Sequence, residues 1–137
     1  MYDKEKLGKI FSDIDRYLND LKSFGISDQG DLGDKKTFYA VSMVVFSAIN
    51  SAIDLGEEVI SANNIGTPGT FKDIFFMLMK GGFISRKMKE QLSALSSYRN
   101  MFSHEYSTYT VEDVFKAFCE ISVIGDFANQ MRKKIKA

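Results

Sequence analysis

The sequence predicts an all-α protein, an antiparallel up-and-down four-helix bundle with one extra short helix. Apolar residues recur at steps of three and four along most of the chain, the period of one helical face. The breaks between these stretches are short and contain glycine, aspartate and asparagine, which favour turns. No stretch of convincing length alternates between apolar and polar residues as a strand would. Short connections between long helices favour antiparallel neighbours.

The composition is that of one globular domain covering residues 1–137. Its 137 residues suffice for a hydrophobic core without stabilising disulfides or metals. Of these residues, 45% are hydrophobic and 26% are charged. The 18 basic and 18 acidic residues balance. This argues against broad, nonspecific nucleic-acid binding, which needs a surplus of Lys and Arg, but leaves room for a local phosphate site.

The single cysteine and the charged N-terminus indicate a cytoplasmic protein. Cys119 cannot form an intramolecular disulfide or a cysteine-based metal cluster, and its place in an apolar helical pattern predicts a buried small hydrophobe. The charged first residues do not resemble a signal peptide, and no apolar run is long enough to predict a membrane span. A reducing cytoplasm is therefore expected, with no metal and no cofactor.

The first helix is expected over residues 3–24, and a loop over residues 25–34. Gly25 ends the helix at a position that favours a left-handed residue, and the loop that follows is rich in glycine and aspartate. The apolar face of this helix comprises Leu7, Ile10, Phe11, Ile14, Tyr17, Leu18, Leu21 and Phe24.

The second helix is expected over residues 35–63 and is apolar nearly all round. Such a helix must be covered on more than one side, and in a chain this small one side could face a partner subunit. Asp54, Glu57 and Glu58 are exceptions, for which a solvated helix end is favoured over a catalytic role. The main stripe comprises Phe38, Val41, Val45, Ala48, Ile49, Ala52, Val59 and Ile60.

A break at residues 63–69, which contains the single proline, precedes a short third helix that ends near Lys80. Thr70 and Asp73 have the spacing of a capping box at its start. The helix is too apolar for a free surface, so most of it is assigned to the core and part of it to an interface.

Ser85 can cap a fourth helix over about 86–102, and Thr110 with Asp113 predicts a second capping box that opens a last helix ending near residue 135. The last helix ends in the basic segment 132–136. Cations at a helix C-terminus favour helix stabilisation, with an RNA-binding patch as the alternative.

The candidate site lies at the end of the fourth helix, where Arg99 precedes His104, the single histidine. Residues five apart on a straight helix differ by about 140° in direction. The two side chains can converge only if the helix ends between them, or if they line different sides of a shared cleft. A helix end near Ser103 is therefore expected.

These residue types suit RNA cleavage without a metal. Histidine exchanges protons near neutral pH, and the planar guanidinium of arginine binds two phosphate oxygens. Asn100 can orient Arg99 or donate to a phosphate oxygen. One chain supplies a single histidine, whereas the reaction needs an acid and a base, so a homodimer with a composite site is expected.

The segment Tyr98–Tyr106 resembles the Arg-x4-His-x-Tyr motif of HepT-like toxins in the HEPN superfamily of small helical RNases. Asn100 matches the polar residue that usually follows their arginine, and residues 53–60 resemble their second helix. The resemblance implies an endoribonuclease toxin that acts on RNA, with Arg99 and His104 as catalytic residues and Asn100 in support. It also implies that Tyr106 accepts AMP groups from a partner antitoxin, a minimal nucleotidyltransferase.

Two alternatives compete with the nuclease. One is a non-catalytic helical module that binds a nucleotide or a partner protein, with Arg99 as a phosphate anchor; the zero net charge and the apolar second and third helices favour it. The other is a helical scaffold without a site. Tyr109 lies near the motif but outside it, so it is given no role.

Overall fold

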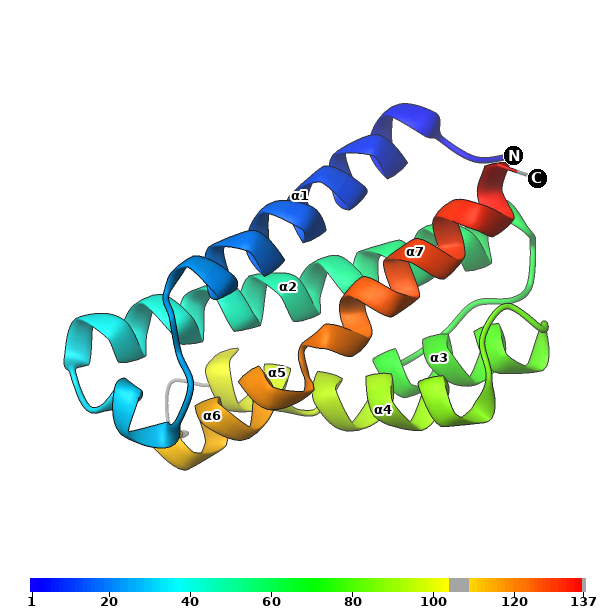
Figure 1. Ribbon diagram of the computed structural model, residues 1–137. Coiled ribbons are helices and arrows are strands. Elements are labelled where there is room, and N and C mark those ends of the chain that lie inside the picture. The colour runs from blue at the N-terminus through cyan, green and yellow to red at the C-terminus, as the bar shows by residue number, and fades with distance from the viewer. Residues whose placement is uncertain (104–108, 137) are drawn as a thin grey trace.

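The computed structural model describes residues 1–103 and 109–136, and the side chains among these except those of 101–103 and 136. In this part of the chain the structure contains helices and no strands, which confirms the all-α prediction (Figure 1). The elements are α1 (Lys4–Ser23), the 3₁₀ helix η1 (Gln29–Leu32), α2 (Lys35–Ala62), α3 (Phe71–Lys80), α4 (Arg86–Ser96), α5 (Tyr98–Ser103), α6 (Val111–Glu120) and α7 (Ser122–Lys136).

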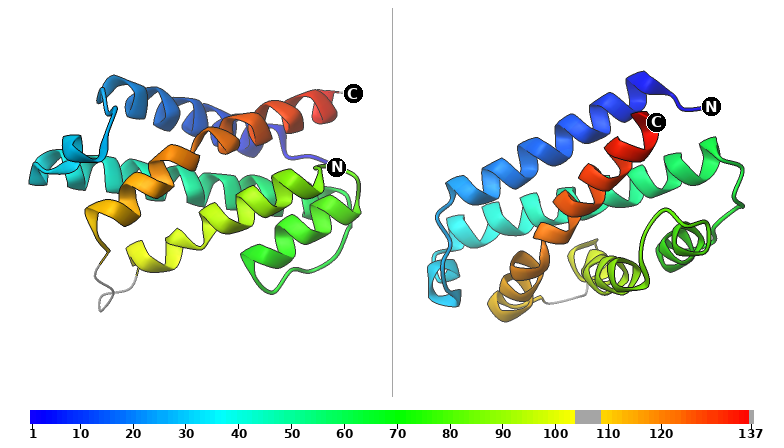
Figure 2. Two further views of the ribbon diagram at one scale, coloured as in Figure 1. Left: turned by 60° about the horizontal axis from the view of Figure 1, so that its bottom comes forward. Right: turned by 45° about the vertical axis from the view of Figure 1, so that its right-hand side comes forward.

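Helix α2 is the centre of the bundle and contacts each of the other described helices. Helix α1 runs along one side of it, while α3 and α4 pack together beside the C-terminal half (Figure 2). Helices α6 and α7 cross back over α2, and α7 returns alongside α1 (Figure 1).

The length and composition of α2 would suffice for a membrane span, with a mean hydropathy of 1.5 in its most apolar 18-residue window. Half of that window is buried inside the bundle. The central position of α2 accounts for its composition, because a helix covered on several sides is apolar nearly all round.

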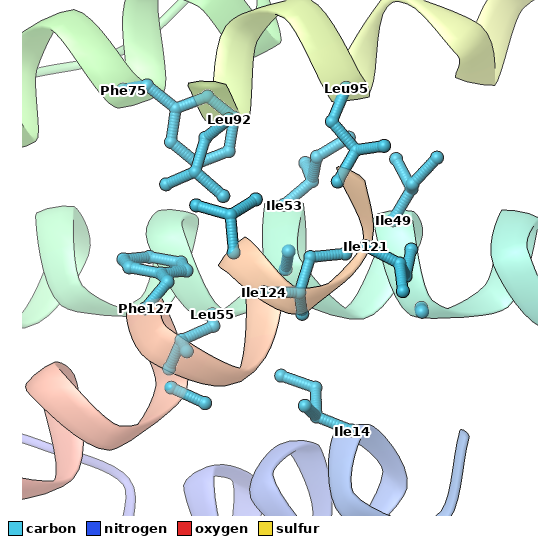
Figure 3. Packing of buried hydrophobic residues seen from close by; sticks show 14 of the residues in the cluster. Ile14, Ile49, Ile53, Leu55, Phe75, Leu92, Leu95, Ile121, Ile124 and Phe127 are labelled. Carbon is cyan, nitrogen blue, oxygen red and sulfur yellow. The ribbon is translucent and has the colours of Figure 1, made fainter. Parts of the chain in front are cut away.

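The core consists of aliphatic and aromatic side chains from α1, α2, α3, α4, α6 and α7, with Leu32 of η1 and Ile84. Figure 3 shows labelled members from α1, α2, α3, α4 and α7 pointing toward one another. Phe75 on α3 and Phe127 on α7 meet edge to face, with ring centroids 6.0 Å apart. The stripes predicted for the first two helices supply part of this core, whose largest fully buried members are Phe75, Phe127, Ile14, Leu32, Ile49, Leu55, Ile60, Leu78, Leu92, Leu95, Ile124 and Met131.

The helix ends follow local sequence rules. The predicted capping boxes form at Thr70 with Asp73 and at Thr110 with Asp113, and the Ser85 hydroxyl accepts the Met88 amide at 3.1 Å. Gly25 has the expected positive φ, at 67°. The capping side chains of Thr70, Ser85 and Thr110 satisfy amides that the first turn of a helix leaves without partners.

Two predicted helices are interrupted. Helix 86–102 breaks at Ser97, and the last helix breaks at Ile121, whose amide donates to the Phe118 carbonyl at 3.2 Å, three residues back, as in a 3₁₀ turn. The predicted loop 25–34 also contains η1. If α4 with α5 and α6 with α7 are each counted as one interrupted helix, the described chain has the five helices predicted, in the predicted order.

Three smaller predictions have different outcomes. Cys119 is exposed, so its assignment to the core is wrong, because it faces outward from α6 beside the buried Ala117. Phe76 on α3 is likewise exposed while Phe75 is buried.

In the basic segment, the Arg132 guanidinium pairs with Asp15 at 2.7 Å and Lys134 donates to the Gly82 carbonyl at 3.3 Å, which gives both cations intramolecular partners.

Candidate functional site

Arg99 and Asn100 lie in the first turn of α5, and both are exposed. Helix α5 contacts α2 and α4, so two longer helices fix its position. Its described part reaches Ser103, directly before His104 in the sequence, so the expected helix end between Arg99 and the histidine falls at the edge of the described residues and stays a prediction.

The break between α4 and α5 is local to Ser97. Its amide donates to the Ser93 carbonyl at 3.2 Å and to the Ala94 carbonyl at 3.3 Å, while its hydroxyl donates to the same Ala94 carbonyl at 2.6 Å. A serine that bonds to a backbone carbonyl one turn earlier competes with the regular helical pattern. The single-helix prediction for 86–102 is wrong at this residue.

Tyr98 fixes the start of α5 to the bundle. Its half-buried ring packs against the hydrophobic core. Burial raises the pKa of the Tyr98 phenol, and the negative charge of Glu120 raises it further. The neutral phenol and its packing hold the start of α5 in place, one residue before Arg99.

His104 and Tyr106 lie outside the described residues. The chain is described again from Tyr109, whose ring stacks on Phe38 of α2 with centroids 5.6 Å apart and an interplanar angle of 20°. The Thr110–Asp113 capping box follows at once. The described residues on both sides of the His-x-Tyr segment are therefore packed against the same bundle.

Arg99 borders a cleft of about 550 Å³ between the C-terminal half of α2 and the start of α3. This volume lies within the range usual for small-molecule sites, about 300–1,000 Å³. The part described is lined by Ile53, Glu57, Ile60, Ser61, Asn64, Gly66, Thr67, Pro68, Gly69, Thr70, Phe71, Ile74 and Arg99. We call it the α2–α3 cleft.

The α2 wall of this cleft is one helical face, on which Ile53, Glu57, Ile60 and Ser61 follow one another at helical spacing. At Asn64 the chain turns with a φ of 52°, in the left-handed region that asparagine tolerates better than most residues. The Ile65 amide donates to the Ile60 carbonyl at 3.1 Å, and the Asn64 amide to the Ser61 carbonyl at 3.3 Å. This is the Schellman pattern of a helix C-terminus.

The three acidic residues of α2 occupy different environments. Glu58 is nearly buried, with 11% of its side chain exposed, and pairs with Lys6 of α1 at 3.3 Å. Glu57 lines the α2–α3 cleft, and Asp54 is exposed outside it. The solvated-end interpretation thus fits Asp54, whereas Glu58 is a structural partner of α1 and Glu57 borders the cleft beside Arg99.

Neither Glu57 nor Arg99 takes part in an ion pair with another described residue. The guanidinium of Arg99 and the carboxylate of Glu57 therefore remain available to a ligand on that part of the surface. The Asp73 carboxylate, in contrast, accepts the Gly69 amide at 3.0 Å and the Thr70 amide at 3.2 Å. It occupies the start of α3, where an anion would otherwise find amide donors.

The described part of the chain has no group of three or more His, Cys, Asp and Glu side chains that could hold a metal ion. Sequence reasoning singled out Arg99 and Asn100, which the structure places in the first turn of α5 with both side chains exposed, but it missed the cleft. The signal available in the sequence was the helical spacing of the polar residues Glu57 and Ser61, which precede Asn64 on the same side of a helix that is otherwise apolar.

Comparison with solved structures places the fold in a known class. The chain resembles YutE, described as a cytosolic protein of unknown function from Bacillus subtilis, with a TM-score of 0.85, 19% identity, and 99% of this chain and 94% of that chain covered. It also resembles the tri-AMPylated HEPN toxin of Shewanella oneidensis in complex with its MNT antitoxin, with a TM-score of 0.84, 16% identity, and 97% and 99% covered. The fold is that of the HEPN toxins.

A further similar structure is a toxin–antitoxin with AMP-PNP, with a TM-score of 0.82, 15% identity, and 93% and 97% covered. No curated protein matches the chain in sequence. A family model described as Ribonuclease HepT-like matches residues 14–133. The chain therefore belongs to the HepT-like ribonuclease family of the HEPN superfamily.

Proposed function

We propose that this protein is a metal-independent endoribonuclease toxin of a toxin–antitoxin system. The observation that carries the proposal is the position of Arg99. Its guanidinium is exposed, unpaired among the described residues, and beside a cleft, five residues before His104 in the sequence. Membership of the HepT-like family supports the same activity.

The chemistry needs one proton acceptor, one proton donor and one cation. One His104 removes the proton of the 2′-hydroxyl, whose oxygen attacks phosphorus as the bond to the 5′-oxygen breaks. The partner subunit's His104 protonates the leaving 5′-oxygen. Arg99 binds the scissile phosphate and stabilises the charge that develops there, with Asn100 in support. The products are a 2′,3′-cyclic phosphate and a 5′-hydroxyl.

A homodimer supplies the second histidine. Beside Tyr109, helix α2 leaves Tyr39 and Met43 uncovered, at 59% and 64% exposed. With Ser42, Phe46 and Tyr109 they line a groove of about 330 Å³. We call this apolar surface the α2 face. A second copy of the chain is its proposed occupant, because the active site is incomplete without a second His104 and the α2 face adjoins Tyr109, close in sequence to the motif.

The proposed partner is a minimal nucleotidyltransferase antitoxin that transfers AMP groups to Tyr106. Among the similar structures is an AMPylated HEPN toxin bound to an MNT antitoxin, which supports this assignment. Each AMP group would add negative charge and bulk two residues from His104, and so repel the RNA phosphate. The proposed location is the cytoplasm.

The test is the cleavage of RNA by protein purified free of AMP groups, with EDTA present. Wild type should release fragments with 2′,3′-cyclic phosphates, whereas His104→Ala and Arg99→Ala, checked for intact folding, should each be slower by about 10²-fold or more. Equal cleavage by wild type and His104→Ala would overturn the mechanism.

The regulatory part has its own test, which is intact-mass analysis after co-expression with the adjacent gene. AMP-sized increments are expected on wild type and on the control Tyr109→Phe, but not on Tyr106→Phe. Increments that persist in Tyr106→Phe would reject Tyr106 as the acceptor.

The α2–α3 cleft favours one alternative, a binding module that holds a nucleotide without cleaving RNA. In that case Arg99 anchors a phosphate and no histidine chemistry follows. Nucleotide binding that depends on Arg99, together with an absence of cleavage by protein free of AMP groups, would select this alternative.

A further inference from the structure

The α2–α3 cleft holds both a cation and a carboxylate, and this pair restricts what can bind there. Arg99 borders one part of the cleft and Glu57 another. A phosphate is attracted to Arg99 and repelled by Glu57. The complementary ligand therefore places its anion at Arg99 and hydrogen-bond donors at Glu57, because a carboxylate is purely an acceptor.

The remaining lining suits the sugar and base of a nucleotide. Apolar groups from α2 and α3 form part of the wall, including Ile53, Ile74 and the half-buried ring of Phe71. Hydroxyl and amide groups of Ser61, Asn64 and the loop that follows supply polar contacts. An aromatic ring can stack on any base, so these residues hold a base without selecting one.

Arg99 is the cationic residue in the described lining of the cleft and is therefore the place assigned to the anion. The amides of Gly69 and Thr70, at the start of α3, already donate to Asp73 at 3.0 and 3.2 Å. They are engaged and leave Arg99 as the phosphate ligand. The position of the phosphate at Arg99 thus directs the nucleoside toward Glu57.

Glu57 can discriminate among the four bases by its two acceptor oxygens. Guanine presents two adjacent donors on its pairing edge, N1–H and the 2-amino group, which match a carboxylate in a bidentate, charge-assisted contact. Adenine and cytosine present one amino group beside an acceptor nitrogen, and uracil presents one N–H between two carbonyl oxygens. In each of these three a lone pair faces the carboxylate.

We propose that the α2–α3 cleft binds the guanosine on the 5′ side of the scissile phosphate, with Glu57 as the residue that recognises the base and Arg99 holding the 3′-phosphate. This assignment rests on the proposed ribonuclease function and names its substrate preference. The enzyme then cleaves after guanosine and leaves guanosine 2′,3′-cyclic phosphate at the new 3′ end.

Calorimetric titration of the intact protein with the four nucleoside 3′-monophosphates tests the proposal without any cleavage. Wild type should bind guanosine 3′-monophosphate most tightly. Glu57→Gln should weaken that binding by about tenfold or more and remove the preference, since one good bidentate contact contributes discrimination of this order. Arg99→Ala should weaken all four ligands alike.

Asp54→Asn is the matched control, because it removes a carboxylate from the exposed surface of the same helix, outside the cleft. It should bind all four ligands as wild type does. Circular dichroism of each variant checks that the fold is intact. Equal affinity of wild type for the four nucleotides would overturn the proposal. So would a uniform gain in affinity of Glu57→Gln for all four. The proposal would also fail if Asp54→Asn lost as much affinity for guanosine 3′-monophosphate as Glu57→Gln does.

The two levels of the proposal fail separately. A guanosine preference that depends on Glu57, in a protein that cleaves no RNA, would support the cleft assignment and reject the nuclease. RNA cleavage that depends on Arg99 and His104, with no guanosine enrichment at the new 3′ ends, would support the nuclease and reject the role of Glu57.

Discussion

Gly56 of α2 and Ile74 of α3 are in such close contact that a Cβ atom on Gly56 would lie 2.5 Å from Cγ2 of Ile74. Real Cβ atoms do not approach a neighbour so closely. The absence of a side chain at Gly56 therefore allows α3 to pack against α2, and this packing positions the α3 wall of the α2–α3 cleft.

Gly56→Ala should destabilise the fold because the added methyl group displaces Ile74 or the start of α3. Overpacking of this kind costs about 1–3 kcal/mol. The measurement is urea unfolding, with Gly8→Ala of α1 as the control, since a Cβ there meets nothing within 4 Å. The control should gain stability by about 0.4–1 kcal/mol. Equal effects of the two substitutions would contradict the account of α2–α3 packing.

Phe75 and Phe76 form a second matched pair, because they are adjacent on α3 but differ in burial. Phe75 is fully buried against Phe127, whereas Phe76 is 50% exposed. Phe75→Ala should lower the free energy of unfolding by about 3–5 kcal/mol, and Phe76→Ala by less than about 1 kcal/mol. Thermal or urea unfolding measures both. A larger loss for Phe76→Ala would show that the register of α3 is wrong.

Asp31 of η1 gives a pH-dependent prediction. The backbone amides of Ser27 and Asp28 donate to its carboxylate at 2.8 and 3.1 Å and lower its pKa below the ordinary value of 3.8, mainly through Ser27. A lowered folded-state pKa contributes stability that is present above the unfolded value and is lost as the pH falls through the folded value.

Asp31→Asn should therefore be less stable than wild type at pH 7, and the difference should shrink below about pH 4. Urea unfolding at both pH values measures this. A difference that stays constant between the two pH values would show that ionisation of Asp31 makes no contribution.

The α2 face predicts the effect of a charge on assembly. Met43→Glu places a carboxylate on the proposed dimer surface, where its desolvation would oppose association. Light scattering should show dimers for wild type and monomers for this variant. Phe76→Glu, a similar change at an exposed apolar residue of α3, should remain dimeric. Dimers of Met43→Glu would place the contact between subunits elsewhere.

Much of the fold could be predicted from sequence because its determinants are local. Thr70 and Asp73 are three residues apart, and the cap they form depends on that spacing and on little else. Gly25 ends α1 for a similarly local reason. The interruption at Ser97 was not predictable in this way, because serine also occurs within regular helices and the hydrogen bonds that it selects depend on how α4 and α5 pack.

The candidate site also has a part that local sequence predicted and a part that depends on tertiary packing. The sequence pointed to Arg99 through its residue type, its spacing from His104 and the motif it shares with HepT-like toxins, and the structure places Arg99 in the first turn of α5. The environments of Glu57 and Glu58 were not predictable, since they depend on which residues of α1, α3 and α5 approach α2. Their contrast, one bordering a cleft and the other paired with Lys6, is a tertiary property.

The central claim is that two copies of the chain share one active site, and mixed dimers test it most directly. Wild-type subunits, free of AMP groups, are paired with differently tagged His104→Ala subunits, and the purified heterodimer is assayed for RNA cleavage. The account predicts a rate close to that of the doubly substituted dimer, because each reaction uses both histidines. Half of the wild-type rate would mean that each subunit cleaves independently and would contradict the shared site.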